Sequence, residues 1–174
     1  MIRPDVVPDA SVLRRLIEFP DIMELLPLVW GRIRLSSAVA AELGSQPGRL
    51  RSRWKNYMRG SRGFVVPCPD VDELVFGELE GDSRVHAGER HVIAQAAKTG
   101  SDVLMDDNDA IHAARELAGR LQLEVFRTGR LLVELKARGA LETVRPHLEA
   151  LRDRHGMFLS PGAFLEILEL AKES

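Results

Sequence analysis

The feature that most constrains the fold is a regular alternation of short apolar runs with longer amphipathic stretches. The apolar runs of strand length are Val6-Val7, Ile33 to Leu35, Phe64 to Val66, Val103 to Met105 and Leu121 to Phe126. The longer segments between them repeat apolar residues at the spacing of one helix face. Strands separated by helices predict parallel strands joined by right-handed crossovers. The sequence therefore predicts an α/β fold with a central parallel sheet of about five short strands.

Length and composition narrow the class of protein. The 174 residues correspond to one domain, so we expect residues 1–174 to form a single domain whose last two helices, about 143–172, pack on the same core. The single cysteine, Cys68, excludes an internal disulfide and a multi-cysteine zinc site. No segment resembles a signal peptide or approaches the ~18 apolar residues of a membrane span. We therefore expect a cytoplasmic protein with no membrane partner.

Carboxylates recur near the predicted carboxyl ends of the strands, where open parallel sheets bind their ligands. Several carboxylates in one cleft would repel one another or take up protons. A hard divalent cation such as Mg²⁺ or Mn²⁺ removes that repulsion and prefers oxygen ligands. Such an ion can hold a phosphodiester and activate a water. The acidic residues at this level are Asp9, Glu42, Glu89, Asp106, Asp107 and Asp109.

Each of these carboxylates also has a purely structural interpretation. Asp9 precedes Ala10-Ser11, and both Asp107 and Asp109 precede Ala110, so all three are suitable helix N-caps. Acidic residues are also favoured in the first turn of a helix by its dipole. From spacing alone, a metal site and a set of helix caps both remain open.

Several segments, in order, resemble the motifs of PIN-domain nucleases. The first resembles the opening strand and Asp-x-Ser of that family, and the second resembles its strand followed by a helix that carries a glutamate. The third resembles the Gly-Glu and Ala/Ile-rich helix of one PIN subgroup, and the fourth resembles the strand with its following aspartates. The tail resembles later segments of the same subgroup, so the resemblance covers about residues 5 to 170. The segments are 6–13, 34–43, 88–96, 103–110, 128–139 and 158–161.

The resemblance implies a PIN-like three-layer α/β/α fold and a metal-dependent endoribonuclease, commonly the toxin of a VapC-type, type II toxin–antitoxin pair. It implies an RNA substrate, an antitoxin protein as partner and a homodimer. It also implies Mg²⁺ or Mn²⁺ as cofactor and a metal-activated water that attacks the phosphorus. The residues that would be catalytic and ligate the metal are Asp9, Glu42, Glu89 and Asp107, and those that would support the site are Ser11, Asp106 and Asp109.

Two alternatives belong to other classes of protein. Many PIN domains have an aspartate where this chain has Arg90, which keeps open a catalytically incomplete PIN-like module that binds RNA or protein. A phosphotransfer enzyme would need an Asp-x-Asp pair or a lysine near a strand end. The first strand here ends in Asp9-Ala10-Ser11, and Lys136 is expected in the middle of a helix.

A basic segment at residues 49–62 is the strongest local charge feature of the chain, and an acidic block at 70–82 offsets it. The segment interleaves Trp54 and Tyr57 with its charges, which indicates a nucleic-acid contact with phosphates paired and bases stacked. Alternatively, it is a solvated helix with the rings packed inward, or a docking surface for an acidic antitoxin tail. The basic residues predicted to contact nucleic acid are Arg51, Arg53, Lys55 and Arg59.

Overall fold

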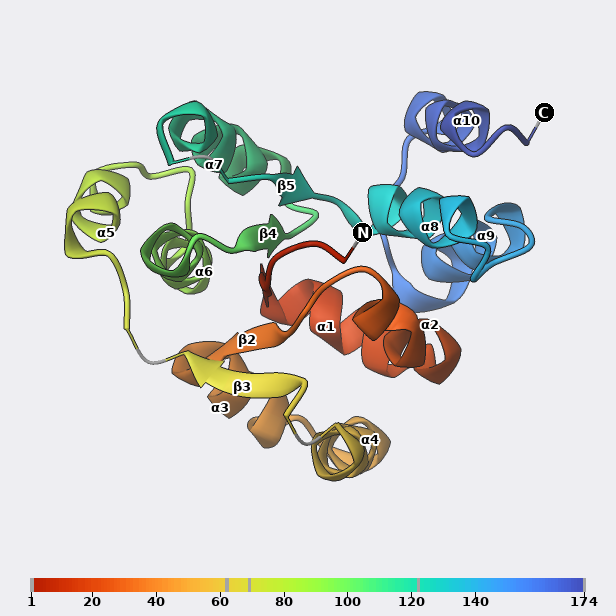
Figure 1. Ribbon diagram of the computed structural model, residues 1–174, viewed down its shortest axis with the longest axis horizontal. Helices are drawn as coiled ribbons and strands as arrows, with labels where there is room; N and C mark the ends of the chain where they lie inside the picture. The colour runs from red at the N-terminus through yellow and green to blue at the C-terminus, as the bar shows by residue number, and fades with distance from the viewer. Residues whose placement is uncertain (1, 62, 69, 122, 174) are drawn as a thin grey trace.

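A five-stranded parallel sheet forms the centre of the computed structural model, which describes residues 2–61, 63–68, 70–121 and 123–173 (Figure 1). The strand order is β3-β2-β1-β4-β5, and every neighbouring pair is parallel. The predicted parallel α/β sheet is therefore confirmed. The strands are β1 (Val6–Pro8), β2 (Ile33–Ser36), β3 (Val65–Cys68), β4 (Asp102–Leu104) and β5 (Val125–Phe126).

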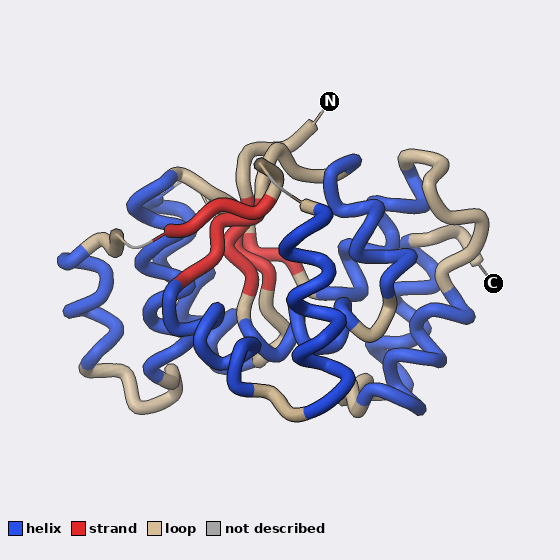
Figure 2. Tube along the Cα trace, turned by 90° about the horizontal axis from the view of Figure 1, so that it is seen from below, coloured by secondary structure: helices blue, strands red, loops and turns tan. Residues whose placement is uncertain are grey.

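Helices cover both faces of the sheet, which confirms the expected three-layer α/β/α architecture. The helices α5, α6 and α7 lie on one side of the sheet, and α1, α2, α8 and α9 lie on the other (Figure 1). Viewed from below, the strands lie side by side between these helices (Figure 2). The helices are α1 (Ala10–Ile17), α2 (Pro20–Leu25), the 3-10 helix η1 (Leu26–Leu28), α3 (Ser37–Ser45), α4 (Gly48–Gly60), α5 (Glu73–Glu80), α6 (Ala87–Thr99), α7 (Asn108–Leu121), α8 (Thr128–Ala137), α9 (Arg145–His155) and α10 (Pro161–Leu170).

Two of the predicted strand boundaries differ from the structure by two residues or more. The third apolar run ends at Val66, before the sequence Pro67-Cys68-Pro69, but the strand continues through Pro67 and Cys68. Pro69 lies outside the described residues. Its main chain stays paired with β2 through Cys68, which lies opposite Ser36. A proline is tolerated there because β3 is an edge strand of the sheet. The fifth strand is shorter than predicted, because the helix before it extends to Leu121.

One cluster of buried apolar side chains extends from β1 to α10. The last two helices contribute Leu148, Leu151 and Leu168 to it. Helix α10 comes close to α8 at Gly129, where a Cβ would lie 3.1 Å from Cγ1 of Ile167. These contacts support the proposal that residues 1–174 form a single domain. None of the described helices is long and apolar enough to cross a membrane.

The strand order reverses between β1 and β4, and this reversal positions the candidate site. Pro8 lies opposite Leu104 at the end of the pair, and the next backbone N–H, that of Asp9, donates to the carbonyl of Leu104 at 2.9 Å. In open α/β sheets, ligands bind in the crevice at the carboxyl ends of the strands where the order reverses. The topology therefore places Asp9 and the residues after β4 at this crevice.

A polar network holds the opposite, amino end of the sheet. The buried carboxylate of Asp102 accepts hydrogen bonds from Nε of Arg3 at 2.8 Å and from Nε1 of Trp30 at 2.9 Å. Arg3 also pairs with Glu124 at 2.7 Å, and its guanidinium lies over the ring of Phe126. The N-terminal segment is thereby joined to β4 and β5, so Asp102 has a structural role away from the crevice.

We expect Asp102→Ala to destabilise the protein by about 3 kcal/mol, because it leaves the buried indole N–H of Trp30 without its acceptor and removes one partner of the half-buried guanidinium of Arg3. Urea unfolding followed by circular dichroism measures the change. Asp153→Ala removes a comparable carboxylate–arginine pair, with Arg152, at an exposed position and should leave the unfolding midpoint unchanged. An equal decrease in the free energy of unfolding in the two variants would contradict the structural role of Asp102.

Candidate active site at the carboxyl ends of the strands

A cleft of about 650 Å³ opens at the carboxyl ends of β1 and β4. The structure places all four carboxylates of the predicted catalytic set on its walls: Asp9, Glu42, Glu89 and Asp107. The predicted supporting residues Ser11 and Asp106 also line the cleft. Asp109, which is exposed in the first turn of α7, does not line it. The predicted residues that line the cleft therefore come from four distant parts of the chain.

Asp9 reaches the cleft as the N-cap of α1. Its Oδ2 accepts hydrogen bonds from the backbone N of Ser11 at 3.0 Å and from Oγ of the same serine at 2.5 Å. The Asp-x-Ser spacing thus caps the helix and fixes the carboxylate in one orientation. Among the described residues, the other oxygen of Asp9 has no hydrogen-bond partner, so it is available to a ligand.

Glu89 reaches the cleft from the first turn of α6. Its Oε2 accepts a hydrogen bond from the backbone N of His86 at 2.8 Å, as in half of a capping box. Burial raises the pKa of Glu89, and the nearby charges of Asp107 and Asp9 raise it further, whereas the hydrogen bond from His86 lowers it. The upward shift of the Glu89 pKa is thus caused mainly by burial, and the charges of the two aspartates add to it.

The two aspartates that follow β4 have different surroundings. Asp107 caps α7, since its Oδ1 accepts from the backbone N of Asp109 and of Ala110, both at 3.0 Å. In Asp106, both carboxylate oxygens have partners. Oδ1 accepts a hydrogen bond from the backbone N of Thr128. Oδ2 accepts a hydrogen bond from Oγ1 of Thr128 and forms an ion pair with Arg15 at 3.0 Å. Asp107 therefore has one oxygen left for a ligand, whereas Asp106 joins α1, β4 and α8.

Glu42 differs from the other three because no hydrogen bond to its carboxylate occurs among the described residues. It projects from the middle of α3, whose N-cap Ser36 follows directly from β2. The side chain is exposed to solvent at the cleft wall. Its carboxylate can therefore reorient toward a bound cation or substrate.

The donor set of the cleft suits a hard divalent cation, because it consists of carboxylate oxygens that already repel one another. The side chains nevertheless do not form a finished coordination shell: within the described ranges, no three His, Cys, Asp or Glu residues lie close enough together to hold a metal ion. The residues fit the chemistry of Mg²⁺ or Mn²⁺, and binding would require their free oxygens to draw together.

Comparison with known proteins identifies the family. A family model described as PIN domain (DUF3368) matches residues 5–173. The chain belongs to the PIN domain family. Proteins of this family are generally nucleases. Among solved structures, the chain is similar to one from "Crystal Structure of FitAcB from Neisseria gonorrhoeae", with 14% identity and a TM-score of 0.48 over 70% of this chain and 96% of that chain. No curated protein matches the sequence.

The PIN-domain cleft also contains residues outside the predicted catalytic and supporting set. Arg15 lines it from α1, and His86 and Arg127 lie on its walls. The segment between α9 and α10 closes one side of it with Met157, Phe158 and Leu159. The spacing of α1 gave no signal for Arg15, since its partner Asp106 is 91 positions away in sequence.

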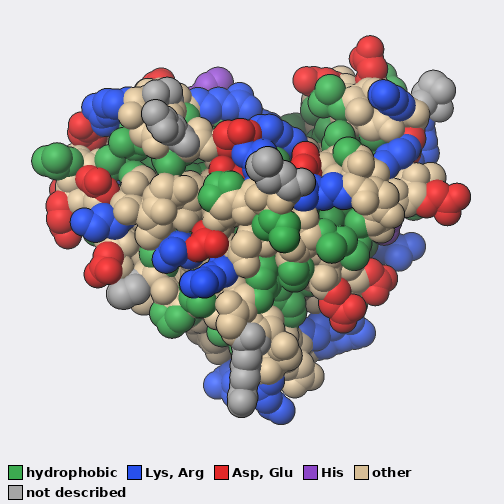
Figure 3. Space-filling view, in the orientation of Figure 1, with side chains coloured by type: hydrophobic (Ala, Val, Ile, Leu, Met, Phe, Trp, Pro, Cys, Tyr) green, Lys and Arg blue, Asp and Glu red, His purple; other side chains and the backbone are tan. Residues whose placement is uncertain are grey.

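The basic helix α4 lies away from this cleft. Lys and Arg side chains gather over α4 at the lower tip of the view in Figure 3. Trp54 is buried and lies against Tyr57, so its ring cannot stack on a base. The inward-packed alternative is therefore confirmed for the rings, while the nucleic-acid role of the charges stays a prediction. Of the predicted contacts, Arg51, Lys55 and Arg59 are exposed, and Arg53 is half-buried and donates to the carbonyl of Glu18 at 3.2 Å. Arg62, the last residue of the basic segment, lies outside the described residues.

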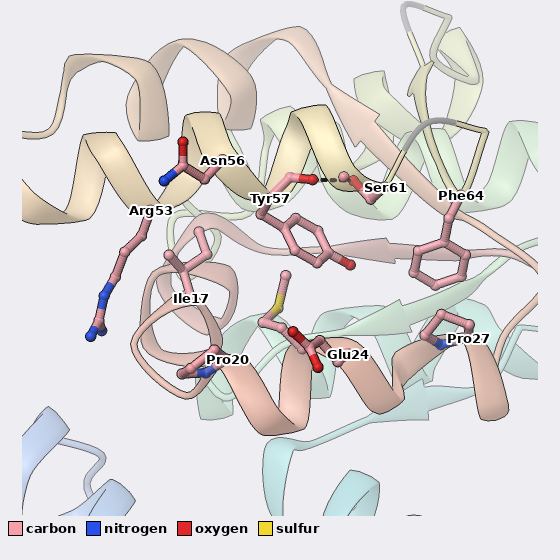
Figure 4. A pocket seen from close by; sticks show the side chains of 11 residues that line it. Ile17, Pro20, Glu24, Pro27, Arg53, Asn56, Tyr57, Ser61 and Phe64 are labelled. Atoms are coloured by element: carbon pink, nitrogen blue, oxygen red, sulfur yellow. Dashed lines mark hydrogen bonds between the residues drawn. The ribbon is translucent and has the colours of Figure 1, made fainter.

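Beneath α4 lies a separate cavity, of about 580 Å³, between this helix and α2 (Figure 4). The ring of Tyr57 points into it, toward Glu24 and Phe64. Burial and the charge of Glu24 raise the pKa of Tyr57 to about 12. Its phenol therefore stays protonated at physiological pH, and the cavity is separate from the carboxylate cleft.

In metal-free protein, we expect Glu89→Gln to increase the free energy of unfolding at pH 7.5 and to change it little at pH 4. The raised pKa means that ionising this carboxyl disfavours the folded state. That penalty is small at pH 4, below the ordinary glutamate pKa of about 4.3, because the carboxyl is mostly protonated in both states, and it grows as pH rises through the folded-state pKa. Glutamine keeps an oxygen acceptor for the N–H of His86.

Urea unfolding in EDTA at the two pH values provides the measurement. Glu80→Gln, at an exposed position on α5, is the control for loss of a charge alone. A gain of the same size at both pH values would show that the effect comes from packing and not from ionisation.

Proposed function

We propose that this PIN domain is a metal-dependent endoribonuclease that hydrolyses RNA phosphodiesters in the cleft between β1 and β4. One observation carries the proposal. Asp9, Glu89 and Asp107 line one cleft, and each has one carboxylate oxygen held by backbone N–H groups while the other lacks a partner among the described residues. Helix caps alone do not require three such carboxylates to face the same hollow.

The four residues Asp9, Glu42, Glu89 and Asp107 would hold Mg²⁺ or Mn²⁺ through these oxygens. When bound, such an ion activates a water and offsets the charge of a phosphodiester. Ser11 keeps Asp9 oriented through its two hydrogen bonds. Asp106 acts as a positioning residue, because its pairing with Arg15 and Thr128 fixes α1 and α8 relative to β4. Asp109, outside the cleft, has no part in this arrangement.

We further propose that the protein is the toxin of a type II toxin–antitoxin pair and acts in the cytoplasm. The order of its motifs, which resembles VapC-type proteins, supports this. The same resemblance gives an antitoxin protein and a second copy of the chain as partners. The charges of Arg51, Lys55 and Arg59 on α4 offer a surface for the acidic tail of an antitoxin or for RNA phosphates.

A second candidate function is a PIN-like module that binds RNA or protein without cutting. The observation in its favour is that the described carboxylates do not form a ready coordination shell. The two functions differ in one measurable property, which is whether a divalent cation binds at the cleft. We expect calorimetric titration with Mn²⁺ to show binding to the wild-type protein and at least about tenfold weaker binding to Asp9→Asn, which loses a ligand charge but keeps the helix cap.

The activity is tested by incubating purified protein, freshly separated from any bound partner, with a mixed-sequence RNA in Mn²⁺ or in EDTA. We expect cutting in Mn²⁺ alone and a loss of rate of about 100-fold or more in Asp107→Asn. Asparagine retains the cap of α7, so this variant should fold normally. Asp109→Asn is the matched control, because the same change two residues later lies outside the cleft.

The outcomes separate the two functions. Two outcomes would contradict the proposed site. One is RNA cutting that persists in EDTA, and the other is a decrease in cutting rate in Asp109→Asn as large as that in Asp107→Asn. Absence of both cutting and Mn²⁺ binding in the wild type would favour the binding module. Binding of Mn²⁺ without cutting of the mixed RNA would keep the metal site and point to a narrow RNA specificity.

A further inference from the structure

A second hollow, of about 380 Å³, adjoins the carboxylate cleft and shares part of its wall. The residues common to both are Asp106, Arg127, Met157, Phe158, Leu159 and Ala163. The second hollow continues over α7, β5 and α8 to the near side of α10. A ligand longer than the cleft can therefore pass from one hollow into the other beside Phe158.

Phe158 is the most exposed large apolar side chain in the described part of the protein, with 88% of its surface accessible. The backbone around it is well fixed. Gly156 adopts the left-handed conformation, with φ of +61°, and the N–H of Met157 donates to the carbonyl of Leu151 at 3.1 Å. The side chain of Met157 is buried, and Ser160 caps α10. The ring is thus presented to solvent by an anchored loop, at the junction of the two hollows.

The wall next to Phe158 carries positive charge. Arg115 from α7 is exposed and makes no ion pair with the described residues. Arg127, at the start of α8, lines both hollows and donates to the side-chain oxygen of Asn108 at 2.8 Å. A third arginine, Arg130, is already committed to Glu124 and to the ring of Phe126. Two guanidinium groups therefore remain for an anionic ligand.

The acidic groups of the same wall do not cancel this charge. Asp106 is paired with Arg15 and Thr128. Glu166, from α10, is the other carboxylate that lines the hollow in the described residues. An exposed ring beside two guanidinium groups is the combination that binds single-stranded nucleic acid, with a base stacked on the ring and phosphates held by arginine. A duplex would not offer the face of a base to Phe158.

We propose that Phe158 is a base-stacking residue and that Arg115 and Arg127 hold the phosphates next to it, so that a single-stranded RNA runs from the carboxylate cleft into the second hollow. This inference rests on the proposed function for its substrate class. It adds the direction in which the strand leaves the cleft and the residues that contact it. Phe158 contributes to affinity, and the carboxylates contribute to cutting.

The test measures binding of a fluorescently labelled single-stranded RNA in EDTA, where the proposed cutting is off, by fluorescence anisotropy. We expect Phe158→Ala to raise Kd about 5- to 100-fold and Phe158→Trp to keep it near the wild-type value, since stacking needs an aromatic ring. Arg127→Gln and Arg115→Gln should each lower the slope of log Kd against log salt by about 0.7, the value for one phosphate contact on a single strand. Double-stranded RNA of the same sequence should bind equally to wild type and Phe158→Ala.

Leu165→Ala is the matched control, because Leu165 is an exposed apolar residue of α10 that lines neither hollow. Three outcomes would overturn the proposal. They are an unchanged Kd in Phe158→Ala, a loss of RNA affinity in Leu165→Ala equal to that in Phe158→Ala, and a wild-type protein that binds no single-stranded RNA. A wild-type oligomer that Phe158→Ala dissociates in sedimentation without a change in RNA affinity would also overturn it, since Phe158 would then face another protein chain. Failure of this proposal and failure of the nuclease proposal are distinguishable, because they are measured separately. The nuclease proposal is tested by RNA cutting in Mn²⁺ with the wild type and Asp107→Asn, whereas this proposal is tested by RNA binding in EDTA.

Discussion

The parallel pairing of β1 with β4 determines where the acidic strand ends lie. The pairing runs from Val6 opposite Asp102 to Pro8 opposite Leu104 and closes with the bond from the N–H of Asp9 to Leu104. The pairing of β1 with β2, in contrast, is confined to Val6 opposite Ile33. Val6 donates to Arg32 on that side, and Pro8, two residues later, faces the same side and has no N–H to donate. The ladder between β1 and β2 therefore ends before the residues that lead into the cleft, whereas the ladder between β1 and β4 continues to them.

Helix capping and ligand binding use the same carboxylates in this cleft without conflict. Asp9 caps α1, Asp107 caps α7, and Glu89 accepts an N–H at the start of α6, so three helix N-termini point toward one hollow. Their partial positive charges and N–H groups offset part of the repulsion between the carboxylates. The offset is incomplete, because the pKa of Glu89 is still raised. A carboxylate accepts through two oxygens, so a cap fixes one and leaves the other for a ligand.

The sequence patterns were sufficient to predict the parallel sheet and the carboxylates that line the cleft, for identifiable reasons. Strand-length apolar runs and the aspartates behind them are local patterns, and the parallel connection converts them into one edge of a sheet. Local patterns could not show that Asp106 is engaged by Arg15 and Thr128, because that contact depends on three separate elements. They also left the direction of Trp54 open, because only packing of α4 on α1 and α3 turns this ring inward. Similarly, nothing in a single sequence distinguishes the exposed Phe158 from a core phenylalanine.

The distribution of charge separates affinity from reactivity in this molecule. The net charge of −2 is small, yet the carboxylate cleft would repel the phosphates of RNA wherever no cation is bound. The attraction for a long anionic ligand must then come from basic groups away from the carboxylates. Such groups are Arg115 in the adjoining hollow, Arg127 on the wall shared by the two hollows, and the arginines of α4. Arg115 and Arg127 line the adjoining hollow, whereas those of α4 lie away from the cleft, so only the former can guide a strand directly into it. Substitution of basic residues should accordingly change binding and its salt dependence, and substitution of cleft carboxylates should change the rate of cutting in bound RNA.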